Sequence, residues 1–107
     1  MKAKILYKIH ENEECDILQS IVRYLYAATV TDIRPTSIIE RNFPLNINVL
    51  PTIVFVNGTV LEGLDKIIKY YELVTGVSNL KEKAIKFNEL NPDYRINDNS
   101  THKKVII

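Results

Sequence analysis

The most reactive side chain that this chain offers is its one cysteine, Cys15. A cysteine attacks disulfides and electrophiles as the thiolate, so the pKa of the thiol decides what it can do. Glu13, Glu14 and Asp16 lie within two residues of it. Nearby negative charge disfavours the thiolate and raises the pKa of a thiol. We therefore expect a poorly reactive thiol that packs as a small buried hydrophobic residue.

Metal-binding side chains are few. His10 lies five residues before Cys15, and His102 lies in a polar segment near the C-terminus. A structural zinc site takes four cysteine or histidine ligands, and this chain has one cysteine and two histidines. We expect no metal site. One cysteine also excludes an intrachain disulfide and a self-contained dithiol active site.

The segment from Val49 to Gly63 carries the strongest structural signal. Pro51 cannot donate to a β-ladder and is suited to the start of a strand. Residues 52–56 form a continuous run of high β propensity, and Asn57-Gly58 favours a tight hairpin turn. We expect two strands here, the second over residues 59–61.

The N-terminal part predicts a strand over residues 4–9, followed by a helix over residues 13–28. Asn12 is placed as the N-cap of that helix, and acidic residues fill the first turn, where the helix dipole favours them. Apolar residues recur at helical spacing and should form its buried face. They are Ile17, Leu18, Ile21, Val22 and Leu25.

Further elements are expected beyond residue 28. A second strand is predicted over residues 30–34, and residues 37–40 have the spacing of a capping box, which starts a helix. That short helix must end near residues 43–44 because of a proline. Another amphipathic helix is expected over residues 64–75, closed by Gly76.

The chain continues with a pattern that predicts a helix over residues 79–90, docked through Leu80, Ala84, Phe87 and Leu90. We expect the apolar end, residues 105–107, to pack on the domain or on a second copy. Strands alternating with helices predict a small α/β domain with a mixed sheet and helices on both faces. At 107 residues and 46% hydrophobic composition, one domain is expected over residues 1–107.

Composition argues against several classes of protein. A formal net charge of +1 with 25% charged residues gives no electrostatic footprint for nucleic acid. No apolar stretch approaches the roughly 20 residues that span a bilayer, and the N-terminus has no signal-peptide organisation. The sequence thus predicts a soluble cytoplasmic protein that binds neither nucleic acid nor membrane.

The order of elements and the hairpin motif resemble the glutaredoxin branch of the thioredoxin-like superfamily over residues 1–76, with residues 77–107 as a C-terminal helix and tail outside it. Leu50-Pro51 is similar to the family segment that places a cis-proline beside two active-site sulfurs. Asn57-Gly58, Gly63 and Asp65 are similar to the family's asparagine-glycine, glycine, aspartate pattern. The resemblance implies that Asp65 is the position that receives the amino end of glutathione.

Cys15 matches the second cysteine of the family's C-x-x-C motif, and Asn12 stands at the first. The first cysteine is the exposed nucleophile in that family, and an asparagine cannot replace it. In an alternative register Cys15 is itself the first position and residues 15–18 replace the motif. That register needs a loop three residues longer and exposes Ile17 and Leu18 in a tight turn.

Three functions follow. The first is a domain without dithiol oxidoreductase activity that binds a protein or peptide. The second is a monothiol exchange protein with Cys15 as the catalytic residue, glutathione as its ligand and no other cofactor. The third is a self-association module, a homodimer formed through Phe87, Leu90 and residues 105–107. For the first, the expected binding residues are Asn12, Leu50, Pro51, Thr52, Gly63 and Asp65.

Overall fold

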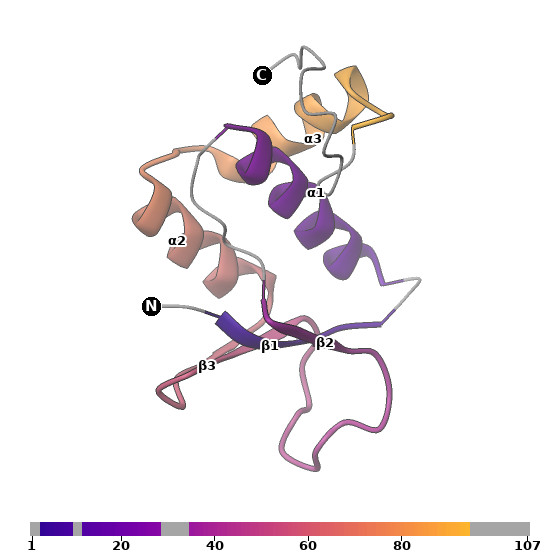
Figure 1. The fold of residues 1–107 in the computed structure, drawn as a ribbon, viewed down its shortest axis with the longest axis vertical. Coiled ribbons are helices and arrows are strands. Elements are labelled where there is room, and N and C mark those ends of the chain that lie inside the picture. Colours follow the sequence, from indigo (N-terminus) through magenta and orange to yellow (C-terminus); the bar gives the residue numbers. More distant parts are fainter. Residues whose placement is uncertain (1–2, 10–11, 29–34, 95–107) are drawn as a thin grey trace.

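The computed structural model describes residues 3–9, 12–28 and 35–94. This part of the chain forms a small α/β structure with four strands and three helices (Figure 1). The predicted strand over residues 30–34 and the apolar end at residues 105–107 lie outside the described residues. The elements in chain order are β1 (Ala3–Tyr7), α1 (Glu13–Ala28), β2 (Ser37–Ile39), β3 (Thr52–Phe55), β4 (Val60–Glu62), α2 (Leu64–Thr75) and α3 (Leu80–Leu90).

The strands form one mixed sheet in the order β2-β1-β3-β4. β1 pairs with β2 in parallel, and β3 runs antiparallel to both β1 and β4. The register places Tyr7 beside Ile39 on one side and beside Thr52 on the other, and Thr52 beside Glu62. The ends of β1, β2 and β4 and the start of β3 therefore meet at the same end of the sheet.

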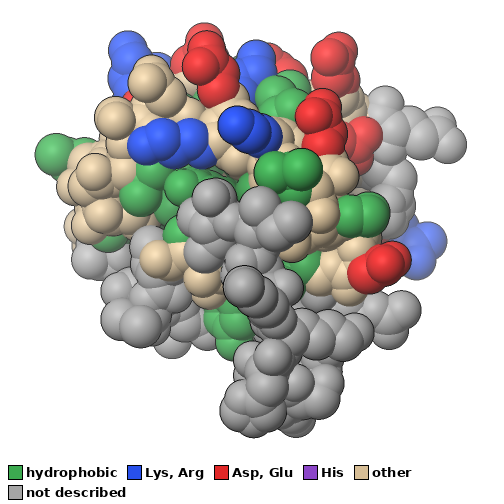
Figure 2. All heavy atoms as spheres, turned by 90° about the horizontal axis from the view of Figure 1, so that it is seen from above, with side chains coloured by type: hydrophobic (Ala, Val, Ile, Leu, Met, Phe, Trp, Pro, Cys, Tyr) green, Lys and Arg blue, Asp and Glu red, His purple; other side chains and the backbone are tan. Residues whose placement is uncertain are grey.

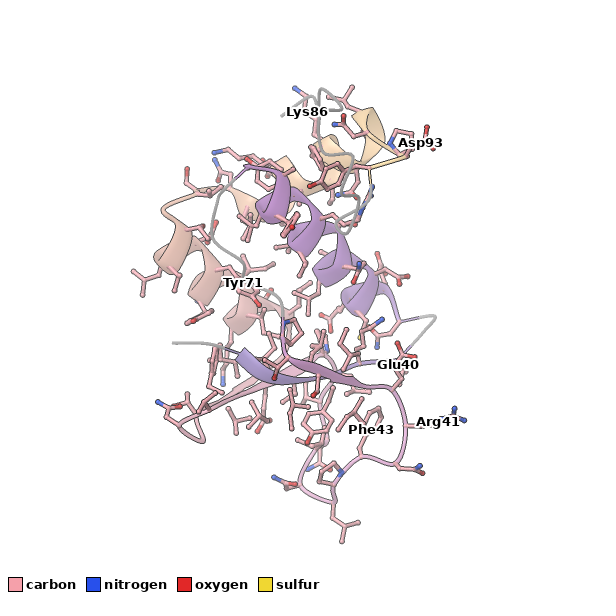
Figure 3. All side chains as sticks on the ribbon, viewed as in Figure 1. Glu40, Arg41, Phe43, Tyr71, Lys86 and Asp93 are labelled. Atoms are coloured by element: carbon pink, nitrogen blue, oxygen red, sulfur yellow. The ribbon has the colours of Figure 1, made fainter. Side chains whose placement is uncertain are left out.

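The described helices cover one face of the sheet, so the expectation of helices on both faces is wrong. Leu6, Ile53 and Phe55 are buried in a single core with the apolar faces of α1, α2 and α3. Tyr71 lies between α2 and the sheet, whereas Phe43 lies on the opposite side (Figure 3). There the loop of residues 40–51 covers part of the other face, with the Phe43 ring edge-on to Tyr7 at 6.0 Å.

The short helix predicted from residue 37 is also wrong, because residues 37–39 form the edge strand β2. Ile38 and Ile39 are β-branched, and pairing with β1 outweighs the local capping-box preference. The Glu40 carboxylate lies 3.2 Å from the Lys8 ammonium, so it pairs with the end of β1 and not with a helix start. Asn42 has a φ of 58°, which an α-helix does not admit.

The hairpin between β3 and β4 is confirmed, with a turn one residue longer than predicted. The Phe55 and Thr59 backbones are joined by a hydrogen bond of 2.9 Å, and only Gly58 of the predicted pair has a positive φ, 89°. Asn57 acts instead through its side chain, which accepts a hydrogen bond from the Thr59 N–H at 3.0 Å. The three-residue loop moves β4 to Val60–Glu62.

The two C-terminal helices end and begin as their sequences predict. Gly76 takes the left-handed conformation, with a φ of 73°, and its N–H donates to the Glu72 carbonyl at 2.9 Å. The Glu72 carboxylate accepts a hydrogen bond of 3.1 Å from the N–H of Leu80, the first residue of α3. A carboxylate at a helix N-terminus is favourable, so α2 helps to position α3.

The predicted docking of α3 is confirmed for Leu80, Ala84 and Phe87, which are buried, and wrong for Leu90, which is 45% exposed. Phe87 packs edge-on against Tyr24 of α1, with ring centroids 5.6 Å apart. Because Phe87 belongs to the core, it is not a surface residue available for self-association.

Arg23 of α1 fastens the end of α3 to the domain. Its guanidinium donates to the Asn88 side chain and to the carbonyls of Asn91 and Tyr94, the Asn91 bond being 3.2 Å long. It also lies over the Tyr94 ring, 5.8 Å from the centroid. Since carbonyls after a helix have no helical partner, this one side chain satisfies acceptors that would otherwise need water.

Candidate functional site

The sequence-predicted site residues gather at the end of the sheet where Tyr7, Thr52 and Glu62 are paired. Five residues separate the end of β1 from the start of α1, Pro51 directly precedes β3, and Gly63 directly follows β4. The Gly63 N–H donates to the Pro51 carbonyl at 2.9 Å, and this bond joins the residue before β3 to the residue after β4. The topology therefore brings the starts of α1 and α2 to the end of the sheet where β3 begins.

Asn12 is the N-cap of α1, as predicted. Its side-chain oxygen accepts a hydrogen bond of 3.0 Å from the Cys15 N–H, and its carbonyl accepts one of 3.0 Å from the Asp16 N–H. This is the usual way in which an asparagine satisfies free N–H groups at a helix start. The amide at this position is a structural cap and has no nucleophilic chemistry.

Cys15 lies in the first turn of α1 and is 2% exposed. Burial raises the pKa of its thiol, and the charges of Asp16 and Glu14 raise that pKa further. A hydrogen bond with the Ile9 backbone and the charge of Lys8 lower the pKa of the thiol. Their combined effect is smaller than that of burial and the acidic neighbours, so the pKa remains raised. The main cause is thus desolvation, and not the acidic neighbours on which the sequence argument rested.

The position of Cys15 also rejects the alternative register. That register needs residues 15–18 in an exposed turn before the helix. α1 instead begins at Glu13, and Leu18 is 1% exposed inside the core.

Native Cys15 is expected to react with Ellman's reagent at least about 100-fold more slowly than the same thiol in guanidinium chloride, because both burial and a raised pKa reduce the accessible thiolate. The rate in the native protein should keep rising with pH above the ordinary thiol pKa of about 8.5. Stopped-flow absorbance from pH 7 to 10 measures both. Fast labelling of the folded protein at neutral pH would show an accessible thiolate.

Pro51 and Thr52 are positioned by the core. The Leu50–Pro51 peptide bond is cis, as the resemblance implies. Both side chains are buried, and the Thr52 hydroxyl donates to the Val49 carbonyl at 2.5 Å. Their side chains therefore fix the shape of the segment and do not offer surface to a ligand.

Val49 and Leu50 are the accessible part of this segment. Val49 is 39% exposed and Leu50 is half-buried. Neither the N–H nor the C=O of Leu50 forms a hydrogen bond with the described part of the chain. The sheet register begins at Thr52, so Leu50 lies beyond the pairing of β3 with both its neighbours.

Gly63 and Asp65 complete the site. Gly63 has a φ of 93°, which favours glycine, and a Cβ added to it would lie 3.7 Å from the Val49 side chain. Asp65 is exposed in the first turn of α2, where the helix dipole favours a carboxylate. Its role in helix stability is sufficient to explain it, and it lies two residues after Gly63, the residue next to the Val49 side chain.

Sequence reasoning missed Lys8, and it did not predict that Val49 is much more exposed than Pro51 and Thr52. Val49 is an exposed β-branched residue beside a buried Pro-Thr pair, and that contrast in burial is not visible in a continuous apolar run. Lys8 follows β1 directly, and its ammonium is held by Glu40 from a segment 32 residues away in the chain. A cation directly after the first strand is the only sequence signal that could have identified it.

A metal site requires a group of ligating side chains, and a membrane-spanning helix requires a long apolar stretch. Within residues 3–9, 12–28 and 35–94, no three histidine, cysteine, aspartate or glutamate side chains are grouped so that they could hold a metal ion. His10 and His102 lie outside these ranges. None of the described helices is long and apolar enough to cross a bilayer.

Comparison of the chain with protein-family models, with curated protein sequences and with solved structures found no match.

Proposed function

We propose that this protein is a thioredoxin-like domain of the glutaredoxin type that lacks dithiol oxidoreductase activity and binds an extended segment of a partner protein. The order of elements from β1 to α2 supports the resemblance, with two departures. Residues 37–51 form β2 and a loop where a short helix was expected, and the described helices cover one face of the sheet (Figure 1). A reducing, cytoplasmic setting suits a domain with one unpaired thiol.

The loss of dithiol chemistry is supported by the start of α1. Asn12 occupies the position of the family's nucleophile and uses its side chain to cap the helix. Cys15, at the second position, is buried, and burial raises the pKa of its thiol. Neither residue offers a thiolate to a disulfide.

The observation that carries the binding proposal is the free backbone of Leu50. Its N–H and C=O have no partner in the described part of the chain, between exposed Val49 and buried Pro51. An extended peptide that pairs with such a segment gains main-chain hydrogen bonds, and neighbouring side chains set its specificity. Val49 would contact an apolar side chain of that peptide.

Random peptides displayed on phage are expected to yield binders that shift the amide NMR signals of residues 49–52 and 63–65. Val49→Lys should weaken their binding at least about tenfold, because it places a charge where apolar contact is needed. Val74→Lys is the matched control, since Val74 is 50% exposed on α2 outside the proposed site. Selection of no binder, or shifts confined to other residues, would contradict the proposal.

A further inference from the structure

Carboxylates outnumber cations around the candidate site. The described residues next to it, 8–9, 12–16, 40–41 and 62–66, include three cations and six carboxylates, a formal charge of −3. The whole chain has a formal net charge of +1. The negative charge is thus a local property of this end of the sheet. The carboxylates are Glu13, Glu14, Asp16, Glu40, Glu62 and Asp65.

Five of these carboxylates, all except Glu40, have no ion pair within the described part of the chain, and Glu62 is exposed at the end of β4. Glu13, Glu14 and Asp16 are exposed in the first turn of α1, and Asp65 is exposed in that of α2. Lys8, the cation at the end of β1, is already paired with Glu40 at 3.2 Å. The helix dipole favours acidic residues at these places. The dipole alone does not explain the number, because the first turns of α2 and α3 have one acidic residue each and the first turn of α1 has three.

Among the described residues, the face of the molecule seen from above the helices is not charged in this one-sided way (Figure 2). On the face seen from above the helices, basic and acidic side chains are interspersed with exposed apolar ones (Figure 2). Such a mixed surface attracts neither sign of charge over a distance.

We infer that the partner segment is basic: an extended peptide with an apolar side chain on Val49 and lysine or arginine on both sides of it. This inference rests on the proposed function and names the chemistry of its ligand. A strand advances about 3.4 Å per residue, so basic residues two positions away lie about 7 Å along it and have long side chains. Glu13 and Glu14 at the start of α1 and Asp65 at the start of α2 are the exposed carboxylates that would receive them.

Three fluorescein-labelled peptides test the inference by anisotropy: KKVTVKK, SSVTVSS and EEVTVEE. The basic peptide should bind the wild-type protein at least about tenfold more tightly than the acidic one at about 0.02 M salt, and the difference should shrink at about 0.5 M salt. The double variant Glu13→Gln/Glu14→Gln and the variant Asp65→Asn should each weaken the basic peptide about threefold or more, because each removes unpaired charge near the peptide.

Asp93→Asn is the matched control, because Asp93 lies beyond α3 at the opposite end of the molecule (Figure 3). It should leave all three affinities unchanged. Equal binding of the three peptides with sensitivity to Val49→Lys would overturn the charge preference and keep the proposed function. Binding of none would overturn both. If the acidic residues serve only the helices, their variants lower the melting temperature and leave peptide affinity unchanged, which also overturns the inference.

Discussion

Phe87→Ala is expected to lower the free energy of unfolding by about 3–5 kcal/mol. The Phe87 side chain is 2% exposed and packs between the rings of Tyr24 and Tyr94, with centroids 5.6 and 5.5 Å away. Alanine would leave a cavity between α1 and α3 and would remove both aromatic contacts. Chemical denaturation followed by circular dichroism measures the change. Phe87→Leu, a smaller truncation, covers the case in which the alanine variant does not fold.

Leu90→Ala is the matched control on the same helix. Leu90 is 45% exposed, so its replacement should change the free energy of unfolding by less than about 1 kcal/mol. Equal effects of the Phe87 and Leu90 substitutions would mean that α3 does not dock as described. The comparison also bears on self-association, because a variant of a core residue should alter stability and not the mass of the protein in solution.

The difference between Phe87 and Leu90 shows what a helical pattern can predict. Periodicity identified a helix at residues 79–90 and its buried stripe, because apolar spacing is a local property of the sequence. It could not determine where the stripe ends. α3 ends against Arg23, which holds Asn88, Asn91 and Tyr94. These contacts join residues that are 65 to 71 positions apart, and the sequence near Arg23 does not predict them.

The segment after residue 36 shows the opposite error. Ser37 and Glu40 have the spacing of a capping box, and that local signal predicted a helix. The structure forms β2 because Ile38 pairs with Leu6 of β1 and Glu40 with Lys8, which directly follows β1, and both partners are distant in the sequence. Pairing with distant strands decides the secondary structure of such short segments, and local sequence patterns do not show that pairing.

The candidate site was predictable to the extent that it depends on turns and caps. Asn12 and Gly63 have roles that follow from their residue types: a helix cap and a backbone position with a φ of 93°. Burial was not predictable in the same way. Pro51 and Thr52 were expected at the binding surface, and both are buried, which leaves Val49 and the Leu50 backbone as the accessible groups. Only the packing of β3 between β1 and β4 determines that outcome.

Asn12→Cys is expected to raise the rate of reduction of a glutathione mixed disulfide at least about tenfold over the wild type, because it places a thiol at the half-buried N-cap position of α1, where the family has its nucleophile. The introduced thiolate attacks the mixed disulfide and releases the substrate's other thiol. Cys15 or a second glutathione then displaces the bound sulfur. A coupled assay with glutathione reductase measures the rate, and the wild type should stay at background.

Asn12→Ser separates the nucleophile from the cap. Serine is as good an N-cap as asparagine, so this variant should keep wild-type stability and have no activity, whereas Asn12→Ala should lose about 1 kcal/mol. Wild-type turnover that disappears in Cys15→Ser would instead establish the monothiol function. No gain in Asn12→Cys would mean that the acidic surroundings also prevent the reaction. Glu13→Gln/Glu14→Gln in the same background would then restore it, because neutral neighbours favour the thiolate and repel glutathione less.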